Sequence, residues 1–302
     1  MRRLFLTAAL LLAAHLPASA IVFWNLGNDA NQADPGTGVP WASVAKIYDP
    51  LNNAISGSAV YLGNGYLLTA NHVYVGPNFD TNDYSQVSFD NINSYLIDPN
   101  FGNYGIQVAP GVDMKVIKLT LNPAGVNAVT LLTSPIEQVA PATLVGWGKG
   151  RDPSIPLAST NVTWGTDATA EKRWGLNEPK FSGSGPYDYL GTIAGASGPS
   201  FAPGGLGDAE ASVALYDSGS GLFQEIADTW YLIGITTSTD DGGSTDFGID
   251  DITSPERGDR DYFARISSYH EEITALVPEP STISLLAMAG AALAAITLRR
   301  RR

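Results

Sequence analysis

The sequence predicts an all-β domain, either a barrel or a sandwich, with a single helix near its C-terminal end. The chain of 302 residues contains 32 glycines and 19 prolines. Short apolar runs recur between these turn-forming residues, which is typical of consecutive strands. Long helical periodicity is rare, so strands rather than helices are expected to build the core.

The clearest local element is a β-hairpin formed by residues 58–62 and 66–69. Its turn, Gly63-Asn64-Gly65, contains the Asn-Gly pair that supplies the positive φ angles of a tight turn. Residues 149–207 carry clusters of Ser, Gly, Pro and Asn, which predict long surface loops. The expected strands are residues 44–48, 58–62, 66–69, 114–119, 143–147 and 230–235.

One apolar stripe at helical spacing lies close to the C-terminal end of the domain. Spacings of four, three, four and three separate its members, Tyr262, Ile266, Tyr269, Ile273 and Leu276. Asp259 and Asp261 stand where the N-terminal end of a helix dipole favours negative charge. We therefore expect a helix over about 261–276 that closes the domain.

The first twenty residues have the pattern of a secretory signal. Arg2 and Arg3 precede an apolar run, and Ala18-Ser19-Ala20 ends it with small residues. The run is too short for a membrane-spanning helix. We expect residues 1–20 to be a signal peptide that is cleaved after Ala20 when the protein is exported.

The C-terminal segment reads as a sorting tail. Val277-Pro278-Glu279-Pro280-Ser281 is followed by an uncharged apolar run at 281–298 and by four arginines at 299–302. This order resembles the PEP-CTERM signal of Gram-negative bacteria, and the resemblance implies transient membrane insertion and cleavage by an exosortase. The alternative is a permanent membrane anchor with the arginines in the cytoplasm. Residues 278–302 are therefore expected to direct the protein to the cell surface or out of the cell.

Charge and cysteine content exclude several classes of function. Residues 21–277 keep eleven basic and 29 acidic residues, a net charge of −18, because the two ends contain six basic residues and a single acidic one. Such a surface repels phosphate backbones, so we expect no nucleic-acid partner. The chain has no cysteine, which excludes disulfides, thiolate metal sites and thiol nucleophiles.

Histidine is the natural general base near neutral pH, and the sequence offers few of them. Of the three histidines, His15 lies in the signal and His270 in the expected helix. His72 directly follows the predicted hairpin, where a rigid strand passes into a loop. On its own, His72 is better explained as an ordinary loop histidine than as a catalytic base.

A serine and an aspartate complete the candidate set. Ser218 lies in Asp217-Ser218-Gly219, where the glycine permits a tight turn and the backbone N–H groups of Tyr216 and Ser218 are candidates for an oxyanion hole. Asp113 enters an apolar strand, where a carboxylate needs a partner. A hydroxyl nucleophile, its base and an orienting acid are the parts of a serine hydrolase.

The motifs around these residues resemble those of the chymotrypsin/trypsin-like serine peptidases. Thr69-Ala70-Asn71-His72 is similar to the family's Thr/Ser-Ala-Ala-His, and residues 113–119 are similar to its aspartate motif. Residues 216–221 are similar to the family's serine motif, Gly-Asp-Ser-Gly-Gly-Pro. Gly146-Trp147-Gly148 resembles a Gly-Trp-Gly that the family has between its aspartate and its serine. The order histidine, aspartate, serine is also that of the family.

The resemblance implies both a fold and an activity. Residues 21–277 would form two packed six-stranded antiparallel barrels, at about 40–125 and 135–258, followed by the closing helix. The implied activity is that of a serine endopeptidase acting on a protein or peptide substrate through an acyl-enzyme. Two other interpretations stay open: an inactive relative that binds partners at the cell surface, and a structural protein anchored by its tail.

The resemblance also implies where a substrate would bind. The family's pocket floor lies six residues before the nucleophile, at Ser212 here, and a neutral floor argues against a strict preference for Lys or Arg. The family's Ser-Trp-Gly, which pairs with substrate backbone, corresponds to Thr237, Ser238 and Thr239. Tyr216 stands where the family has a glycine beside the oxyanion hole.

The expected new N-terminus suggests an activation step. Cleavage after Ala20 would expose Ile21-Val22, which resembles the Ile-Val terminus that activates many family members. By that resemblance, the Ile21 ammonium would pair with Asp217.

No cofactor or metal is expected. The acidic stretch near the C-terminal end lacks the spacing of an EF-hand, so a solvated acidic loop is favoured over a calcium site. Its members are Asp240, Asp241, Asp246, Asp250 and Asp251.

Overall fold

A computed structural model provides the structure of the chain. The predicted signal, the apolar run 281–298 and the terminal arginines lie outside the residues that it describes. The described residues are 21–27, 30–51, 53–76, 85–137, 140–159, 161–194, 206–240, 244–246 and 259–278.

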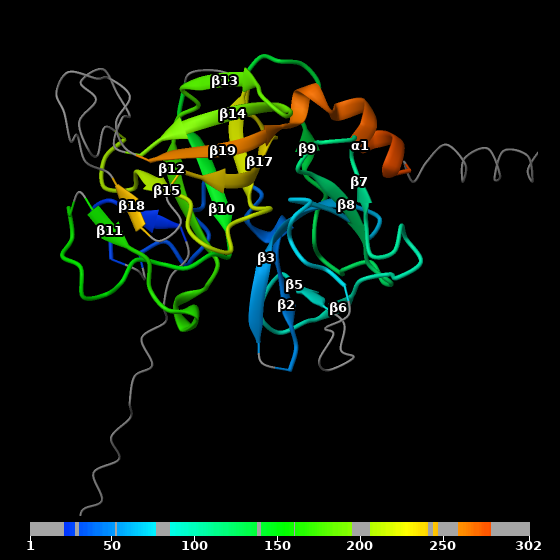
Figure 1. Ribbon diagram of the computed structural model, residues 1–302, viewed down its shortest axis with the longest axis horizontal. Helices are drawn as coiled ribbons and strands as arrows, with labels where there is room; N and C mark the ends of the chain where they lie inside the picture. The colour runs from blue at the N-terminus through cyan, green and yellow to red at the C-terminus, as the bar shows by residue number, and fades with distance from the viewer. Residues whose placement is uncertain are drawn as a thin grey trace, which may run out of the picture.

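The described chain is mostly β, as predicted, and most of its strands belong to two large antiparallel sheets (Figure 1). The first sheet, blue to cyan in Figure 1, has seven strands in the order β6-β5-β2-β3-β4-β8-β7. Its strands are β2 (Val44–Asp49), β3 (Ala54–Gly63), β4 (Tyr66–Thr69), β5 (Gln86–Ser88), β6 (Tyr95–Leu96), β7 (Ile106–Gln107) and β8 (Lys115–Lys118).

The first sheet curls back on itself. Ile97, just after β6, forms an antiparallel bridge with Leu119, just after β8. The Thr120 N–H donates to the carbonyl of Leu96 at 2.9 Å on the same seam. Because β6 is an edge strand and β8 lies near the opposite edge, these contacts require strong curvature, and the sheet forms a half-barrel around an apolar interior. That interior includes Ala45, Ile47, Ala59, Leu67, Val87 and Ile117.

The second sheet has eight strands, green to orange in Figure 1, in the order β12-β10-β16-β17-β19-β14-β13, with β9 parallel to β17. Two short pairs, β1 with β15 and β11 with β18, flank it. The strands are β1 (Val22–Phe23), β9 (Thr130–Leu131), β10 (Ala142–Gly146), β11 (Asn161–Thr163), β12 (Arg173–Asn177), β13 (Phe181–Ser184), β14 (Asp188–Ile193), β15 (Ala211–Ser212), β16 (Gly221–Ile226), β17 (Thr229–Thr239), β18 (Ser244–Asp246) and β19 (Arg260–Arg265).

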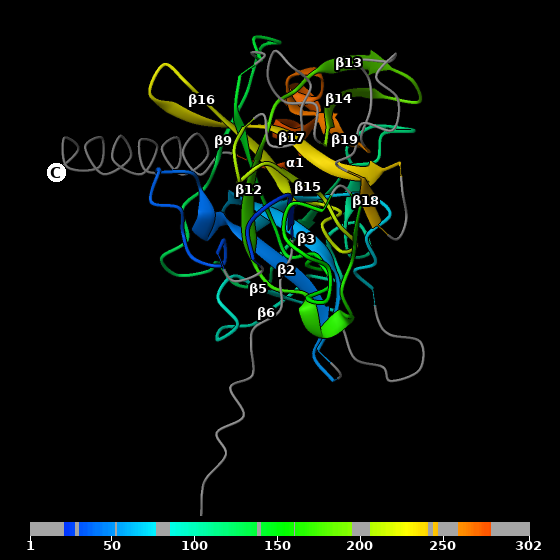
Figure 2. The same cartoon turned by 90° about the vertical axis from the view of Figure 1, so that its left-hand side faces the viewer.

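The two sheets share one apolar core. A single buried cluster joins Val60 and Val116 of the first sheet to Phe223 and Ile235 of the second. Trp147, which follows β10, is 2 % exposed and bonds across the boundary: its indole N–H donates to the carbonyl of Val44 at 3.2 Å. Helix α1 (His270–Leu276) contributes Ile273 to the same cluster. In Figure 2, strands β2, β3, β5 and β6 of the first sheet lie below β14, β17 and β19 of the second.

The predicted helix over 261–276 is wrong in its first half. Residues 260–265 form β19, which pairs with β14 on one side and β17 on the other. These two neighbours supply ladder hydrogen bonds that override the helical spacing of the apolar residues. Asp261 is consequently buried in a strand, and the acids in the first turn of α1 are Glu271 and Glu272.

The prediction of loops throughout residues 149–207 is also wrong in part. Strands β11 to β14 lie within this segment. They were not predicted because the segment is rich in small and polar residues, which are typical of loops. In β12 buried residues alternate with half-buried ones, and its buried members are Arg173, Gly175 and Asn177. Small and polar residues that bond internally can occupy a buried strand, which composition alone does not reveal. The six strands expected elsewhere are confirmed, with bounds shifted by a few residues.

Replacing Trp147 by Phe should destabilise the domain. The change removes the indole N–H that bonds to Val44 and leaves space beside it, so we expect a loss of about 1–3 kcal/mol in the free energy of unfolding. Urea unfolding measures it. The matched control is Trp230→Phe, since the Trp230 N–H donates to Thr37 at 3.2 Å in an exposed position and should contribute less than about 0.5 kcal/mol. Equal losses in both variants would contradict the role assigned to Trp147.

Candidate active site

Strand pairing in the first sheet brings His72 and Asp113 together. Strand β4 ends three residues before His72, β8 begins two residues after Asp113, and Thr69 pairs with Lys115 across the ladder. Lys115 is largely buried, and its ammonium donates to the carbonyls of Asn71 and Val73, at 3.1 and 2.5 Å, on either side of the histidine. The loop that carries His72 is therefore fixed to β8.

The His72 ring bridges Asp113 and Ser218. Its Nδ1 lies 2.8 Å from Asp113 Oδ2, and its Nε2 lies 2.8 Å from Ser218 Oγ. Asp113 Oδ1 also accepts the backbone N–H of His72 at 3.0 Å, so the carboxylate holds both ring and backbone. A carboxylate can only accept, which makes Nδ1 the donor and leaves Nε2 to accept the serine proton. The structure thus brings together the three residues singled out in the sequence.

Ser58, in the middle of β3, anchors the loop that carries Ser218. The Ser58 N–H donates to the carbonyl of Ser218 at 2.8 Å, and the Ser58 hydroxyl donates to the carbonyl of Tyr216 at 3.3 Å. That hydroxyl also accepts a hydrogen bond from the backbone N–H of Trp147 at 3.0 Å. Ser58 is fully buried. Sequence reasoning missed this residue, because a serine within a strand carries no signal of a partner 160 residues away.

The turn after Ser218 accepts only glycine. Gly219 has a φ of +87°, and a β-carbon there would lie 2.1 Å from the carbonyl oxygen of Ser58. Its N–H donates to Thr236 at 2.8 Å. Tyr216 has a φ of +77°, a conformation that a residue with a β-carbon rarely adopts. Within the described chain, the N–H groups of Tyr216 and Ser218 donate to no protein acceptor, so both predicted oxyanion donors are free.

The predicted activation pair is also adjacent. Asp217 is fully buried and accepts the N–H groups of Gly148 at 2.8 Å, Ala214 at 2.9 Å and Ile21. Burial raises the pKa of Asp217 to about 7, although these N–H groups and Arg173 act in the opposite direction. Ile21 is itself 1 % exposed. The chain end expected after signal cleavage therefore already lies against the Asp217 carboxyl.

The residues predicted to bind substrate lie on β15 and β17 and differ in exposure. Ser212 and Thr237 are buried, and Ser238 is exposed. The Thr237 hydroxyl donates to the carbonyl of Tyr262 at 3.0 Å, so it is engaged within the protein. Thr239 lies opposite Asp261 in the β17–β19 register.

Asp261 is a second residue that sequence reasoning missed, because its position was assigned to a helix end. It is fully buried and accepts the Ser212 hydroxyl at 2.9 Å and the Val213 N–H at 3.3 Å. Burial raises the pKa of Asp261 to about 7, while these hydrogen bonds oppose the shift. A carboxyl group thus lies directly behind the neutral Ser212.

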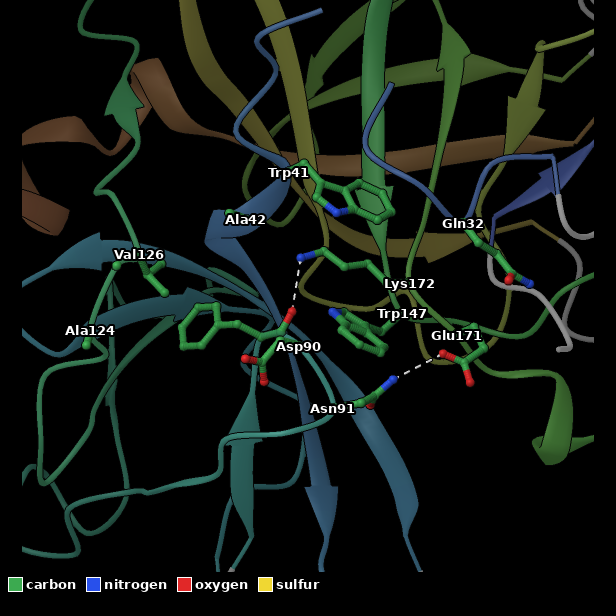
Figure 3. Close-up of a pocket in the computed structure, with 12 residues that line it drawn as sticks. Gln32, Trp41, Ala42, Asp90, Asn91, Ala124, Val126, Trp147, Glu171 and Lys172 are labelled. Carbon is green, nitrogen blue, oxygen red and sulfur yellow. Dashed lines mark hydrogen bonds between the residues drawn. The ribbon is translucent and has the colours of Figure 1, made fainter. Parts of the chain in front are cut away.

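A cavity of about 430 Å³ opens at the boundary of the two sheets, and no member of the His72–Asp113–Ser218 cluster lines it. Figure 3 shows the Lys172 side chain between the indoles of Trp41 and Trp147. The Lys172 Nζ lies 4.8 Å from the Trp41 ring centre and donates to the carbonyl of Phe89 at 3.3 Å. Burial lowers the pKa of Lys172 to about 7.

The C-terminal tail matches a known family model. Residues 276–302 match the PEP-CTERM protein-sorting motif, as the sequence predicted. This motif is a sorting signal recognised by exosortase, and it implies export to a cell-envelope or secreted destination in a Gram-negative bacterium. No curated protein matches the chain. Among the described residues, no helix combines the length and apolar composition needed to cross a bilayer.

Metal-binding side chains do not gather in the part of the chain that the structure describes: no group of three or more His, Cys, Asp or Glu is placed to hold an ion. Of the acidic stretch considered above, Asp241, Asp250 and Asp251 lie outside the described residues.

The buried Lys172 should make stability depend on pH. The folded state gives up this proton near pH 7, whereas a lysine in the unfolded chain keeps it until about pH 10.4. Between these values the unfolded state binds more protons, so the free energy of unfolding should rise with pH. Lys172→Met removes this dependence. The free energy of unfolding of this variant should exceed that of the wild type by the largest margin at pH 6. The difference between the two proteins should shrink by up to about 4 kcal/mol as the pH rises to 10.

Urea unfolding of both proteins at pH 6, 8 and 10 measures the effect. Lys172→Arg is the matched control, because its guanidinium stays charged across this range. The stability difference between the Arg and Met variants should stay constant. A constant difference between wild type and Lys172→Met would show that the lysine does not titrate near neutrality.

Proposed function

We propose that the protein is an exported serine endopeptidase of the trypsin-like kind, with His72, Asp113 and Ser218 as its catalytic residues. The observation that carries the proposal is the pair of 2.8 Å contacts that place the imidazole between the serine hydroxyl and the carboxylate. Two antiparallel sheets around a shared core, with a short C-terminal helix, fit the two-barrel architecture that this family implies.

The chemistry begins with attack by Ser218. His72 Nε2 takes the hydroxyl proton as Ser218 Oγ bonds to the carbonyl carbon of a peptide substrate. Asp113 keeps the other ring proton on Nδ1 and stabilises the imidazolium. The N–H groups of Tyr216 and Ser218 hold the developing oxyanion. The imidazolium then gives its proton to the leaving amine, and an acyl-enzyme remains.

Water completes the cycle. His72 removes a proton from the water as its oxygen attacks the acyl carbon, and Ser218 recovers its proton when the ester breaks. His72 is half exposed, with 50 % of its side chain accessible, so water can reach the ring. The products are an acid and an amine, and no cofactor takes part.

The sorting tail and the expected signal peptide support an activity outside the cytoplasm. The sorting motif gives an exosortase the segment that it recognises, and cleavage there would release the folded domain from the envelope. A protein or peptide substrate would be met at the cell surface or beyond it. The net charge of −18 on residues 21–277 favours solubility of a released domain.

A fluorophosphonate probe tests the proposal. Wild-type protein should form a covalent adduct on Ser218, located by peptide mass spectrometry. His72→Ala should abolish labelling because no base remains, and Asp113→Asn should slow it by about 10⁴-fold because the wrong tautomer is stabilised. His270→Ala, in α1, is the matched control and should be labelled like wild type.

The absence of an adduct on folded wild-type protein would overturn the proposal. That outcome would favour a related fold that only binds partners at the cell surface. The tyrosine at position 216 would then explain the lost activity, because its β-carbon disfavours the positive φ that presents this oxyanion donor.

Signal cleavage is proposed to activate the enzyme. In the full-length chain Ile21 offers Asp217 a peptide N–H. Cleavage after Ala20 would turn this group into an ammonium, and a buried carboxylate is stabilised by a cation at contact distance. The rigid pairing would fix the neighbouring Tyr216 and Ser218 N–H groups.

Two purified forms test this step, one that starts at Ile21 and one that retains Ser19-Ala20. The longer form keeps the raised pKa of Asp217, so its stability should fall as pH rises from about 4 to 7. The form that starts at Ile21 should keep its stability and label faster at pH 8. Asp217→Asn should erase the difference. A natural start other than Ile21, found by N-terminal sequencing, would refute the idea.

A further inference from the structure

The backbone of Lys149 sets the orientation of one proposed oxyanion donor. The Lys149 N–H donates to the carbonyl of Leu215 at 2.7 Å. That carbonyl belongs to the same planar trans peptide as the Tyr216 N–H, so the two groups point in opposite directions. By fixing the carbonyl, Lys149 directs the free N–H of Tyr216 to the other side of the peptide.

The side chains of the same residues form a closed contact around Tyr216. The Tyr216 hydroxyl donates to Asp167 Oδ1 at 3.1 Å, and Lys149 Nζ lies 2.7 Å from the same oxygen. Lys149 Nζ also lies 5.4 Å from the centre of the Tyr216 ring. The hydrogen bond from Lys149 lowers the pKa of Asp167, whereas burial and the Asp167 carboxylate raise the pKa of Tyr216. At neutral pH the pair is therefore a phenol that donates to a carboxylate.

The turn that carries Asp167 is tied to the segment that carries Lys149. Asp167 begins a 3₁₀ turn, residues 167–169. The Thr169 hydroxyl accepts the N–H of Gly150 at 3.3 Å, and the Gly165 N–H donates to the carbonyl of Gly150 at 2.7 Å. These contacts hold Lys149 and Asp167 in place without any contribution from Tyr216.

We propose that Lys149 and Asp167 are positioning residues that hold Tyr216 in its left-handed conformation and so keep its N–H available to an oxyanion. Glycine would adopt a φ of +77° without help, but a tyrosine β-carbon disfavours it. Removing the side-chain contacts lets Tyr216 relax to a negative φ, which rotates the 215–216 peptide, breaks the hydrogen bond from the Lys149 N–H to the Leu215 carbonyl and turns the Tyr216 N–H away. The proposal rests on the proposed function, because it assigns a role within that same site.

The test measures Asp167→Ala by two readouts, the rate of fluorophosphonate labelling and the kcat and KM for a peptide substrate. Labelling and kcat should both fall by at least about tenfold, and by no more than the roughly 10²–10³-fold that complete loss of one oxyanion donor produces. KM should change little, since the donor acts mainly in the transition state. Asp167 is 72 % exposed, so the variant should keep its folded structure, which thermal unfolding checks.

The decisive measurement repeats Asp167→Ala in a Tyr216→Gly background. A glycine needs no support at positive φ, so the second substitution should then leave labelling and kcat unchanged. Tyr216→Asn serves the same purpose if the glycine variant does not fold, because asparagine tolerates this conformation. Glu178→Ala, which breaks the Lys180–Glu178 ion pair, is the matched control and should act like wild type.

The possible results of these experiments separate the positioning role from the proposed function. Equal labelling of wild type and Asp167→Ala would overturn the positioning role and leave the proposed function intact. The same loss in the Tyr216→Gly background would also overturn it, because the effect would then not act through Tyr216. A wild-type protein that is not labelled would overturn the proposed function and this proposal together.

Discussion

The site depends on the contacts that Ser58 makes between the two sheets. Its N–H and hydroxyl hold the carbonyls of Ser218 and Tyr216, and its hydroxyl accepts from Trp147. Its carbonyl accepts the Thr69 hydroxyl at 2.6 Å, just ahead of the loop that carries His72. One buried residue of the first sheet thus bonds to the loop that carries the serine, to the residue that follows β10 and to the end of β4. The two halves of the site cannot shift independently, because they share these hydrogen bonds.

The interior that supports this site contains buried carboxyl groups, in a chain without disulfides. Asp217 and Asp261 are both fully buried, and each satisfies its oxygens with backbone N–H or hydroxyl donors. Such groups destabilise the fold when they lack partners but specify a single arrangement when they have them. Each also belongs to a segment of the candidate site: Asp217 precedes Ser218 in the chain, and Asp261 lies behind Ser212.

Four strands of the first sheet, β2, β3, β4 and β8, could be predicted because their evidence is local. Asn64-Gly65 determines a hairpin turn by backbone conformation alone, and the apolar runs on either side are the strands β3 and β4. The same reasoning failed at residues 260–265, where helical spacing of tyrosine and isoleucine coincides with a strand. There the ladder partners β14 and β17 decided the conformation. A local pattern cannot report hydrogen bonds to residues that lie 22 to 75 positions away.

The sequence by itself determined the identity of His72, Asp113 and Ser218 as a candidate set, the sorting tail, and a tight turn permitted by the glycine after the serine. These follow from residue types and short motifs, whose chemistry does not depend on distant contacts. Only the tertiary structure decided that Ser58 joins the two halves of the site, that Asp261 lies behind Ser212, and that Lys149 and Asp167 contact Tyr216. Each of these contacts joins residues brought together by sheet packing, and the direction of a hydrogen bond is set by that packing rather than by neighbours in the chain.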